Sequence, residues 1–355
     1  MTFKDPTPTD TARQLKEVLT PDDLERLNPF HSIAENLCGV LPINEGRELL
    51  ANRVEPAAVR IALVSMPGLR VEPQQFSTLP KNAVADDIDK GACLRQLVAY
   101  PHAVARDVFA TFEAALSSAL SLSPHVICFS ELALPSVDGV PMQEAKRLVF
   151  EASRERDVVI IAGSAHDART LYNTGYLFYP GGPENGRPFH KSVSAWSMRE
   201  LISAPAARRI LLAKVAGLRV ATMICLDIAD YASIASVVKV GDGIDVLLVP
   251  CYTTLFEKMD RVAIVASRAL PGIVGMVNAV IPDVAAKPRQ VAWFGKLRDP
   301  DDQSAAGGVQ VSVIDIAYEE FQKSRSEMRS KSENKMRWLF GRRDMPTLLD
   351  DPAVT

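Results

Sequence analysis

The sequence predicts an α/β fold with mixed sheets, and three observations support this class. Short apolar runs of strand length recur along most of the chain, and segments with helical spacing of apolar residues separate several of them. The turn cluster Pro180–Gly186 lies between two extended stretches, which predicts a hairpin and therefore antiparallel as well as parallel pairing.

The first half of the chain alternates regularly between the two element types. Residues 58–65 form an apolar run that predicts a buried strand, and residues 103–122 place apolar side chains at helical spacing until Pro124 ends the helix. A strand at 125–129 and a helix at 142–156 follow. Further strands are predicted at 157–163, 171–179 and 187–191, the last two forming the hairpin.

The second half continues the alternation. Strands are predicted at 218–224, 244–250, 273–279 and 308–316, and helices at 231–240 and 258–270. The run 262–281 is nearly uncharged, but it contains Arg268 and is interrupted by Pro271, so it predicts a buried helix followed by a strand. We therefore expect no transmembrane segment.

Composition limits the classes of function. Hydrophobic residues make up 47% of the 355 residues and charged residues 23%, which excludes disorder throughout the chain, and the net charge of -3 gives no global reason to expect binding to nucleic acid or anionic membranes. The five cysteines form no C-x-x-C pair and the first residues lack the apolar core of a signal peptide, so we expect a cytoplasmic protein. Neither a glycine-rich phosphate loop nor a zinc signature is present, so we expect no cofactor and no metal.

Three regions are predicted: a helical N-terminal extension at 1–57, a main domain at 58–316 and a basic C-terminal tail at 317–355. Thr20 is placed to cap a helix in the extension, which either packs on the main domain or contacts a second subunit or partner. In the tail, Phe321–Arg343 contains eight lysines and arginines and two glutamates, a local balance of +6. This tail either packs on a neighbouring subunit or binds an acidic partner surface, a membrane or nucleic acid.

Three chemically distinct side chains follow predicted strands. Glu131 comes just after strand 125–129, Lys191 ends the second arm of the hairpin, and Cys225 follows strand 218–224. Taken singly, they are read as a solvated acid, a surface lysine and a core thiol. Residues beyond strand ends gather along one edge of an α/β sheet, so the three can converge. A carboxylate could then take the thiol proton and an ammonium could stabilise an oxyanion.

These segments resemble the nitrilase, or carbon-nitrogen hydrolase, superfamily, which uses a Glu-Lys-Cys triad in this order. Phe129–Pro135 is similar to the family's glutamate motif, His190 and Lys191 to its lysine motif, and Leu218–Asp227 to its cysteine motif. Downstream, Asp245–Pro250 and Ala266–Ala279 also resemble family segments. The resemblance covers about Val59 to Ile316.

The resemblance implies a four-layer α-β-β-α sandwich and a role for each triad member. Cys225 would be the nucleophile, Glu131 the general base, and Lys191 with the backbone N–H of Leu226 would hold the oxyanion. A second family glutamate would correspond to Glu200, which a solvated position explains equally well. A homo-oligomer, a dimer or higher, is also expected.

Departures from the family pattern lie in segments that line the substrate pocket. Ser130 replaces the usual proline, and Ile228–Ala232 and Val291–Gly295 differ from the family motifs. Cys251, Tyr252 and Thr253 follow strand 244–250 and either contact the substrate or have a structural role.

The predicted function is hydrolysis of non-peptide carbon-nitrogen bonds through a cysteine thioester. We expect a small-molecule substrate, an amide rather than a nitrile. One alternative is an acyltransferase that uses the same triad. Another is a catalytically altered regulatory or scaffold protein that keeps the fold.

Overall fold

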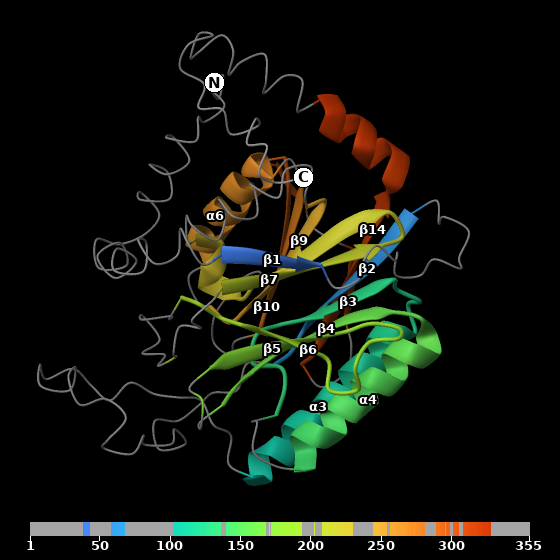
Figure 1. Cartoon of the computed structure of the whole chain (residues 1–355), viewed down its shortest axis with the longest axis vertical. Coiled ribbons are helices and arrows are strands. Elements are labelled where there is room, and N and C mark those ends of the chain that lie inside the picture. The colour runs from blue at the N-terminus through green and yellow to red at the C-terminus, as the bar shows by residue number, and fades with distance from the viewer. Residues whose placement is uncertain are drawn as a thin grey trace, which may run out of the picture.

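Two seven-stranded sheets form the centre of the protein (Figure 1). The computed structural model describes residues 38–42, 58–67, 102–135, 140–167, 170, 172–193, 202, 208–229, 244–253, 256–270, 272–280, 289–294, 296–298, 301–304 and 308–327. The helices α3 and α4 lie together on one side of the sheets and α6 lies on the other side (Figure 1). This arrangement is the predicted α-β-β-α sandwich.

One sheet has the strand order β13-β14-β2-β3-β4-β5-β6. Strands β2, β3 and β4 are parallel to one another, whereas β5, β6, β14 and β13 add antiparallel pairs. The bounds are β2 Ala58–Ser65, β3 Val126–Phe129, β4 Val159–His166, β5 Asn173–Phe178, β6 Arg187–His190, β13 Asp301–Ser304 and β14 Gln310–Ala317. The sheet is therefore mixed, as the hairpin signal at 180–186 predicted.

The other sheet has the order β1-β7-β8-β9-β10-β11-β12. Strands β8, β9 and β10 are parallel, so their C-terminal ends lie at the same edge. The bounds are β1 Cys38–Pro42, β7 Arg208–Val215, β8 Leu218–Thr222, β9 Val246–Cys251, β10 Ile273–Asn278, β11 Arg289–Trp293 and β12 Lys296–Arg298. The helices are α3 His102–Leu120, α4 Val140–Arg156 and α6 Phe256–Ala269.

The strands of the first sheet are apolar on both faces because each face is covered. Along β2, Ile61 and Leu63 pack in the core between the sheets, whereas Ala62 and Val64 pack with the residues of α3 and α4. Burying one large aliphatic side chain stabilises the fold by about 1.5–3 kcal/mol. The continuous apolar runs in the sequence are thus the signature of a sheet between two layers.

The structure describes residues 38–42 of the predicted N-terminal extension. Residues 38–42 form the strand β1, which pairs in parallel with β7 at the edge of a sheet. The pairing partner is 170 residues further along the sequence, and local sequence patterns do not report such a contact. The helix proposed after Thr20 lies outside the described residues.

A helix follows β14 within the predicted C-terminal tail. Residues 318–327 are helical, and this helix packs on the main domain, with Phe321 and Arg325 almost fully buried. Phe321 stacks against Phe294 with ring centroids 6.1 Å apart. The described start of the predicted tail therefore packs against the main domain, and the rest of the tail lies outside the described residues.

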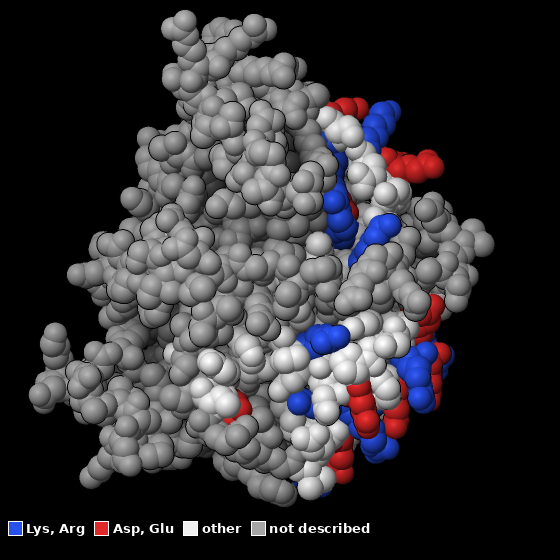
Figure 2. All heavy atoms as spheres, in the orientation of Figure 1, with Lys and Arg blue, Asp and Glu red and all other residues white. Residues whose placement is uncertain are grey.

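The described outer surface carries charges of both signs. Figure 2 shows Lys and Arg interspersed with Asp and Glu over the described part of the visible face. Ion pairs join Arg106 to Glu144 and Arg147 to Glu151 on α3 and α4. Among the described helices, none has both the length and the apolar character that a membrane crossing requires.

Candidate active site

Glu131 is held at the end of β3 by a network of backbone contacts. The N–H of Ser130 donates to the carbonyl of Val64, and the N–H of Glu131 donates to the carbonyl of Cys251 in the other sheet. Ser130 Oγ accepts a hydrogen bond from the N–H of Met66 at 3.2 Å. Ser130 therefore ties the glutamate loop to the segment after β2.

The loop of Glu131 passes very close to β4 at Gly163. Gly163 has a φ of +76°, and a Cβ at this position would lie 2.3 Å from the carbonyl oxygen of Ser130. Glycine is needed here both for its backbone conformation and for this approach. Leu132 next to the glutamate has a φ of +58°, and its N–H donates to Ser164 Oγ at 3.2 Å.

The carboxylate of Glu131 is buried and accepts three hydrogen bonds. Oε1 accepts from Lys191 Nζ at 2.6 Å and from Asn173 Nδ2 at 2.9 Å, and Oε2 accepts from the N–H of Tyr252 at 2.9 Å. Glu131 is 3% exposed and Lys191 1% exposed. Water is therefore largely excluded from this pair, and the electrostatic interaction is stronger than it would be at the surface.

Lys191 is positioned by residues on both sides of it in the sequence. Its N–H donates to the carbonyl of Asn173, which continues the pairing of β6 with β5. The next two N–H groups, of Ser192 and Val193, donate to the buried carboxylate of Asp227 at 2.8–3.1 Å. Asp227 thus links the lysine segment to the segment that contains Cys225.

Cys225 begins a tight turn just beyond β8. It has a φ of +47° and is the first residue of the 3-10 helix η4, Cys225–Ala229. A left-handed conformation is uncommon for a residue other than glycine and costs about 1–3 kcal/mol, and such strain is found most often at functional sites. The side chain is 1% exposed. Leu226, whose N–H is the predicted oxyanion donor, is the second residue of η4.

Cys251, the last residue of β9, connects the three predicted triad members. Its thiol is hydrogen-bonded to Cys225 and interacts electrostatically with Glu131 and Lys191. Burial, followed by the hydrogen bond to Cys225, raises the pKa of the Cys251 thiol well above its ordinary value of 9.0. Cys251 therefore stays protonated at neutral pH, and the structure brings Glu131, Lys191, Cys225 and Cys251 into one buried cluster.

The other two predicted pocket residues are half-buried and held through their backbone. Tyr252 donates its N–H to Glu131, and burial, with a smaller effect of Glu131, raises the pKa of its phenol. The N–H and carbonyl of Thr253 both bond to the side-chain amide of Asn278, at 2.9 and 3.0 Å. Asn278 ends β10, so hydrogen bonds link the segments at the ends of β3, β9 and β10 to one another.

Sequence reasoning missed Asn173, which contacts both partners of the buried ion pair. Its carbonyl accepts the N–H of Lys191 and its side chain donates to Glu131. A polar residue at the start of a predicted strand, opposite the hairpin arm that ends at Lys191, was the available signal. Asp227 was noted only as part of the cysteine motif. Glu200 lies outside the described residues.

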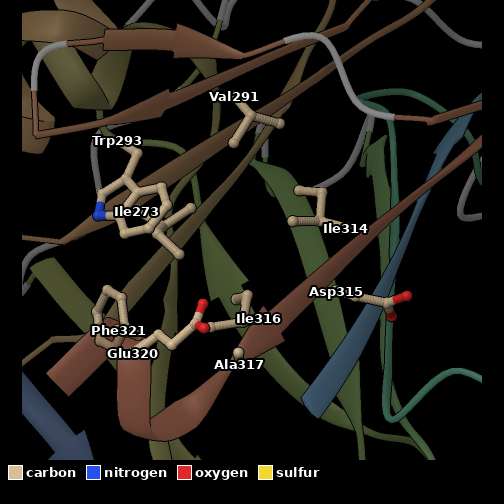
Figure 3. A pocket seen from close by; sticks show the side chains of 9 residues that line it. All are labelled: Ile273, Val291, Trp293, Ile314, Asp315, Ile316, Ala317, Glu320 and Phe321. Carbon is tan, nitrogen blue, oxygen red and sulfur yellow. The ribbon is translucent and has the colours of Figure 1, made fainter. Parts of the chain in front are cut away.

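A separate apolar pocket of about 90 Å³ lies at the other end of the sheets. Figure 3 shows Ile273, Trp293 and Phe321 close together around it. Ile273 is the first residue of β10, whereas the residues around Cys225 lie beyond the last residues of the parallel strands. The pocket is thus distinct from the candidate active site.

Clustered carboxylates and thiols can also bind metal ions. Within the described parts of the chain, no group of three or more His, Cys, Asp or Glu side chains is arranged to hold a metal ion. The buried cluster is composed of a carboxylate, an ammonium and thiols, a set suited to proton transfer and nucleophilic attack.

Comparison with solved structures identifies the fold. The chain superimposes on XC1258 from Xanthomonas campestris, described as a CN-hydrolase superfamily protein with an arsenic adduct in the active site, with a TM-score of 0.54 and 12% identity over 78% of this chain and 97% of that one. This chain has the carbon-nitrogen hydrolase fold. No family model and no curated protein matches its sequence.

The carbon-nitrogen hydrolase fold also occurs within larger proteins. A glutamine-dependent NAD+ synthetase from Acinetobacter baumannii superimposes with a TM-score of 0.50 and 12% identity, covering 73% of this chain and 45% of the synthetase. This chain therefore corresponds to less than half of that protein. At 12% identity, the similarity between this chain and the synthetase is a similarity of fold.

Proposed function

We propose that this protein hydrolyses non-peptide carbon-nitrogen bonds, with a small amide as substrate and Cys225 as the nucleophile. The observation that carries the proposal is the buried ion pair between Glu131 and Lys191, 2.6 Å apart, in one cluster with the thiols of Cys225 and Cys251. The carbon-nitrogen hydrolase fold supports it, because the cluster lies at the sheet edge where residues from several strand ends meet.

The first half of the reaction forms a thioester. Glu131 takes the proton of the Cys225 thiol, and the thiolate sulfur attacks the amide carbon. The Lys191 ammonium and the N–H of Leu226 stabilise the negative oxygen of the tetrahedral intermediate. When the carbon-nitrogen bond breaks, Glu131 returns its proton to the departing nitrogen, so ammonia or an amine leaves as a neutral molecule.

The second half releases the acid. Glu131, again a carboxylate, takes a proton from a water molecule whose oxygen attacks the thioester carbon. The carbon-sulfur bond then breaks, the sulfur of Cys225 is protonated again, and the carboxylic acid departs. One carboxylate can serve both halves because three fixed donors, on Lys191, Asn173 and Tyr252, hold its position.

The low exposure of the cluster supports both roles of the ion pair. Each charge of the pair is 3% exposed or less, so an oxyanion formed beside Lys191 would meet little competition from water. Lysine offers a compact charge that can interact with both a carboxylate and a developing oxyanion. The strained backbone at Cys225 supports a nucleophile fixed in one orientation.

The test is turnover of a mixed library of amides and nitriles, followed by ammonia release and intact mass, with Cys225→Ala as the control. We expect release from one or more amides and an acyl adduct on the wild-type protein only. Addition of an amine acceptor distinguishes hydrolysis from acyl transfer, because a transferase would form a new amide at the expense of the acid. Equal turnover by wild type and Cys225→Ala would disprove the nucleophile. Absence of both turnover and adduct would favour the scaffold alternative.

A further inference from the structure

The cluster contains a second thiol for which the proposed hydrolysis has no use. Cys251 is 1% exposed, as is Cys225, and its thiol is hydrogen-bonded to Cys225. Cys251 Sγ also lies 3.3 Å from the carbonyl oxygen of Val249. Neither the nucleophile, the base nor the oxyanion donors require sulfur at this position.

The backbone register also brings these two residues together. Strands β8 and β9 are parallel, with Thr222 opposite Leu248, and the N–H of Met223 still donates to Leu248. Cys225 and Cys251 each lie three residues beyond that pair. Neighbouring strands are about 4.8 Å apart, and the Cα atoms of a disulfide are about 4.4–6.8 Å apart. The register therefore brings Cys225 and Cys251 to the same edge of the sheet, and the turn that begins at Cys225 sets their separation.

We infer that Cys225 and Cys251 form a redox-active pair that a hydroperoxide converts to a reversible disulfide. In the first step, the Cys225 thiolate attacks one oxygen of the peroxide, the oxygen-oxygen bond breaks, and Cys225 sulfenic acid forms as hydroxide departs and is protonated to water. In the second step, the Cys251 sulfur attacks the Cys225 sulfur, and the hydroxyl group leaves with the Cys251 proton as water. Two thiols and one hydrogen peroxide thus give one disulfide and two waters.

The surroundings assign a different role to each thiol. Burial keeps Cys251 protonated, whereas Cys225 lies beyond the end of β8, at the start of the strained turn η4. Cys225 would therefore react with the peroxide first, and Cys251 would resolve the sulfenic acid before further oxidation. The hydrogen bond between the thiols places the resolving sulfur next to its target.

Cys128 provides a matched comparison, because it too is a free and buried cysteine. It lies within β3 and packs in the core between the two sheets. Its thiol is 3.7 Å from the carbonyl oxygen of Phe129, the next residue in its own strand. Cys128 is therefore expected to take no part in the disulfide.

The disulfide would have a direct consequence if Cys225 is the nucleophile. Its sulfur would be bonded to Cys251, so hydrolysis would stop until a thiol reductant restored it, and the disulfide would protect Cys225 from irreversible oxidation. This consequence rests on the proposed function, whereas the formation of the disulfide does not.

The experiment treats the full-length protein with a small excess of hydrogen peroxide and follows intact mass and peptide maps. We expect a product lighter by two hydrogen atoms, a cross-linked peptide that joins Cys225 to Cys251, and recovery of the original mass with dithiothreitol. Because the readout is mass, the result is independent of whether any amide is a substrate.

Two single substitutions complete the test. Cys251→Ala should lose the cross-link and accumulate sulfinic and sulfonic acid on Cys225, whereas Cys128→Ala should behave as wild type. Circular dichroism checks the fold, and Cys251→Ser replaces Cys251→Ala if the latter does not fold. The inference is wrong if the wild type gains oxygen on Cys225 as fast as the Cys251 variant, or if the cystine joins Cys225 to any other cysteine.

Discussion

Two buried carboxylates, Glu131 and Asp245, lie at opposite ends of the parallel strands and look alike at first inspection. Both are 3% exposed or less, and each is paired with a buried cation. Asp245 directly precedes β9, and its carboxylate accepts from Arg325 of the 318–327 helix and from the N–H of Arg219. Glu131 follows β3 and pairs with Lys191.

The surroundings of the two carboxylates differ. Asp245 is held by arginines, which remain charged and do not exchange protons at any ordinary pH, and Arg325 also donates to the carbonyl of Ile244. Glu131 lies beside Lys191 and Cys251, and the thiol of Cys251 interacts in turn with Cys225, which is on a strained backbone. A buried ion pair alone therefore does not identify a catalytic site. A buried carboxylate in a cluster with thiols is a stronger indication of one.

The largest expected difference between the two sites is in activity. Glu131→Gln keeps the shape of the side chain but removes its ability to accept a proton, so kcat/KM should fall by about 10²–10⁴-fold. Steady-state kinetics on protein with a wild-type circular dichroism spectrum measures this. Activity within twofold of wild type would exclude Glu131 as the base.

The Asp245 site should instead govern stability. Arg325→Met leaves a buried carboxylate without its main partner, and the free energy of unfolding should fall by about 3–5 kcal/mol. Urea denaturation measures the loss, and kcat/KM per folded molecule should stay unchanged. An unfolding free energy equal to that of wild type would contradict the assignment of Arg325 as the residue that fastens the 318–327 helix.

Asp227 should have an intermediate effect through the position of Lys191. Asp227→Asn weakens the hydrogen bonds to Ser192 and Val193, so kcat should fall by about tenfold or more with little change in KM. The control is Asp315→Asn, which alters an exposed ion pair with Arg60 and should change stability by less than about 1 kcal/mol. A rise in KM with kcat unchanged would show that Asp227 acts on substrate binding instead.

The smallest effect is expected from the buried thiol of Cys128. Burial raises its pKa above the ordinary value of 9.0, so the folded protein retains a proton that the unfolded chain loses above pH 9. This contribution to stability is complete below pH 9 and declines as pH rises, by at most about 1.4 kcal/mol per pH unit. Between pH 8 and 10, the free energy of unfolding should fall less steeply with pH for Cys128→Ala than for the wild type. Identical slopes would disprove this contribution.

Much of the fold could be predicted from sequence because apolar runs report directly on burial. The strands β2, β3, β4, β8, β9 and β10 all lie close to their predicted ranges, since each is covered on both faces. The strands β1, β7, β11, β12 and β13 were missed, and three of them, β1, β12 and β13, lie at sheet edges. An edge strand is defined by its partner, and polar residues such as those of Asp301–Ser304 carry little local signal.

The reactive groups of the candidate site could be proposed from the sequence, but the groups that hold them in position could not. Glu131, Lys191 and Cys225 each follow a recognisable strand or hairpin arm, and their residue types suggested the chemistry. Asn173 could not be identified, because its contact with Glu131 spans 42 residues and depends on the pairing of β5 with β6. The N–H of Tyr252, which also holds Glu131, is a backbone group without any sequence signature.

The role of Arg325, in the predicted C-terminal tail, also could not be inferred from the local sequence. A local balance of +6 favours a solvated or partner-binding surface, yet this arginine is buried against Asp245. Its role is set by a residue 80 positions earlier.

Peptide mapping of a trapped acyl intermediate tests the central claim most directly. The amide with the fastest ammonia release is mixed with wild-type protein, with Glu131→Gln and with Cys225→Ala, and the reactions are stopped with acid before mass spectrometry. The proposed mechanism predicts an acyl group on the Cys225 peptide of the wild type and none in Cys225→Ala. An acyl group on Cys251 or Cys128, or turnover by Cys225→Ala at the wild-type rate, would contradict it.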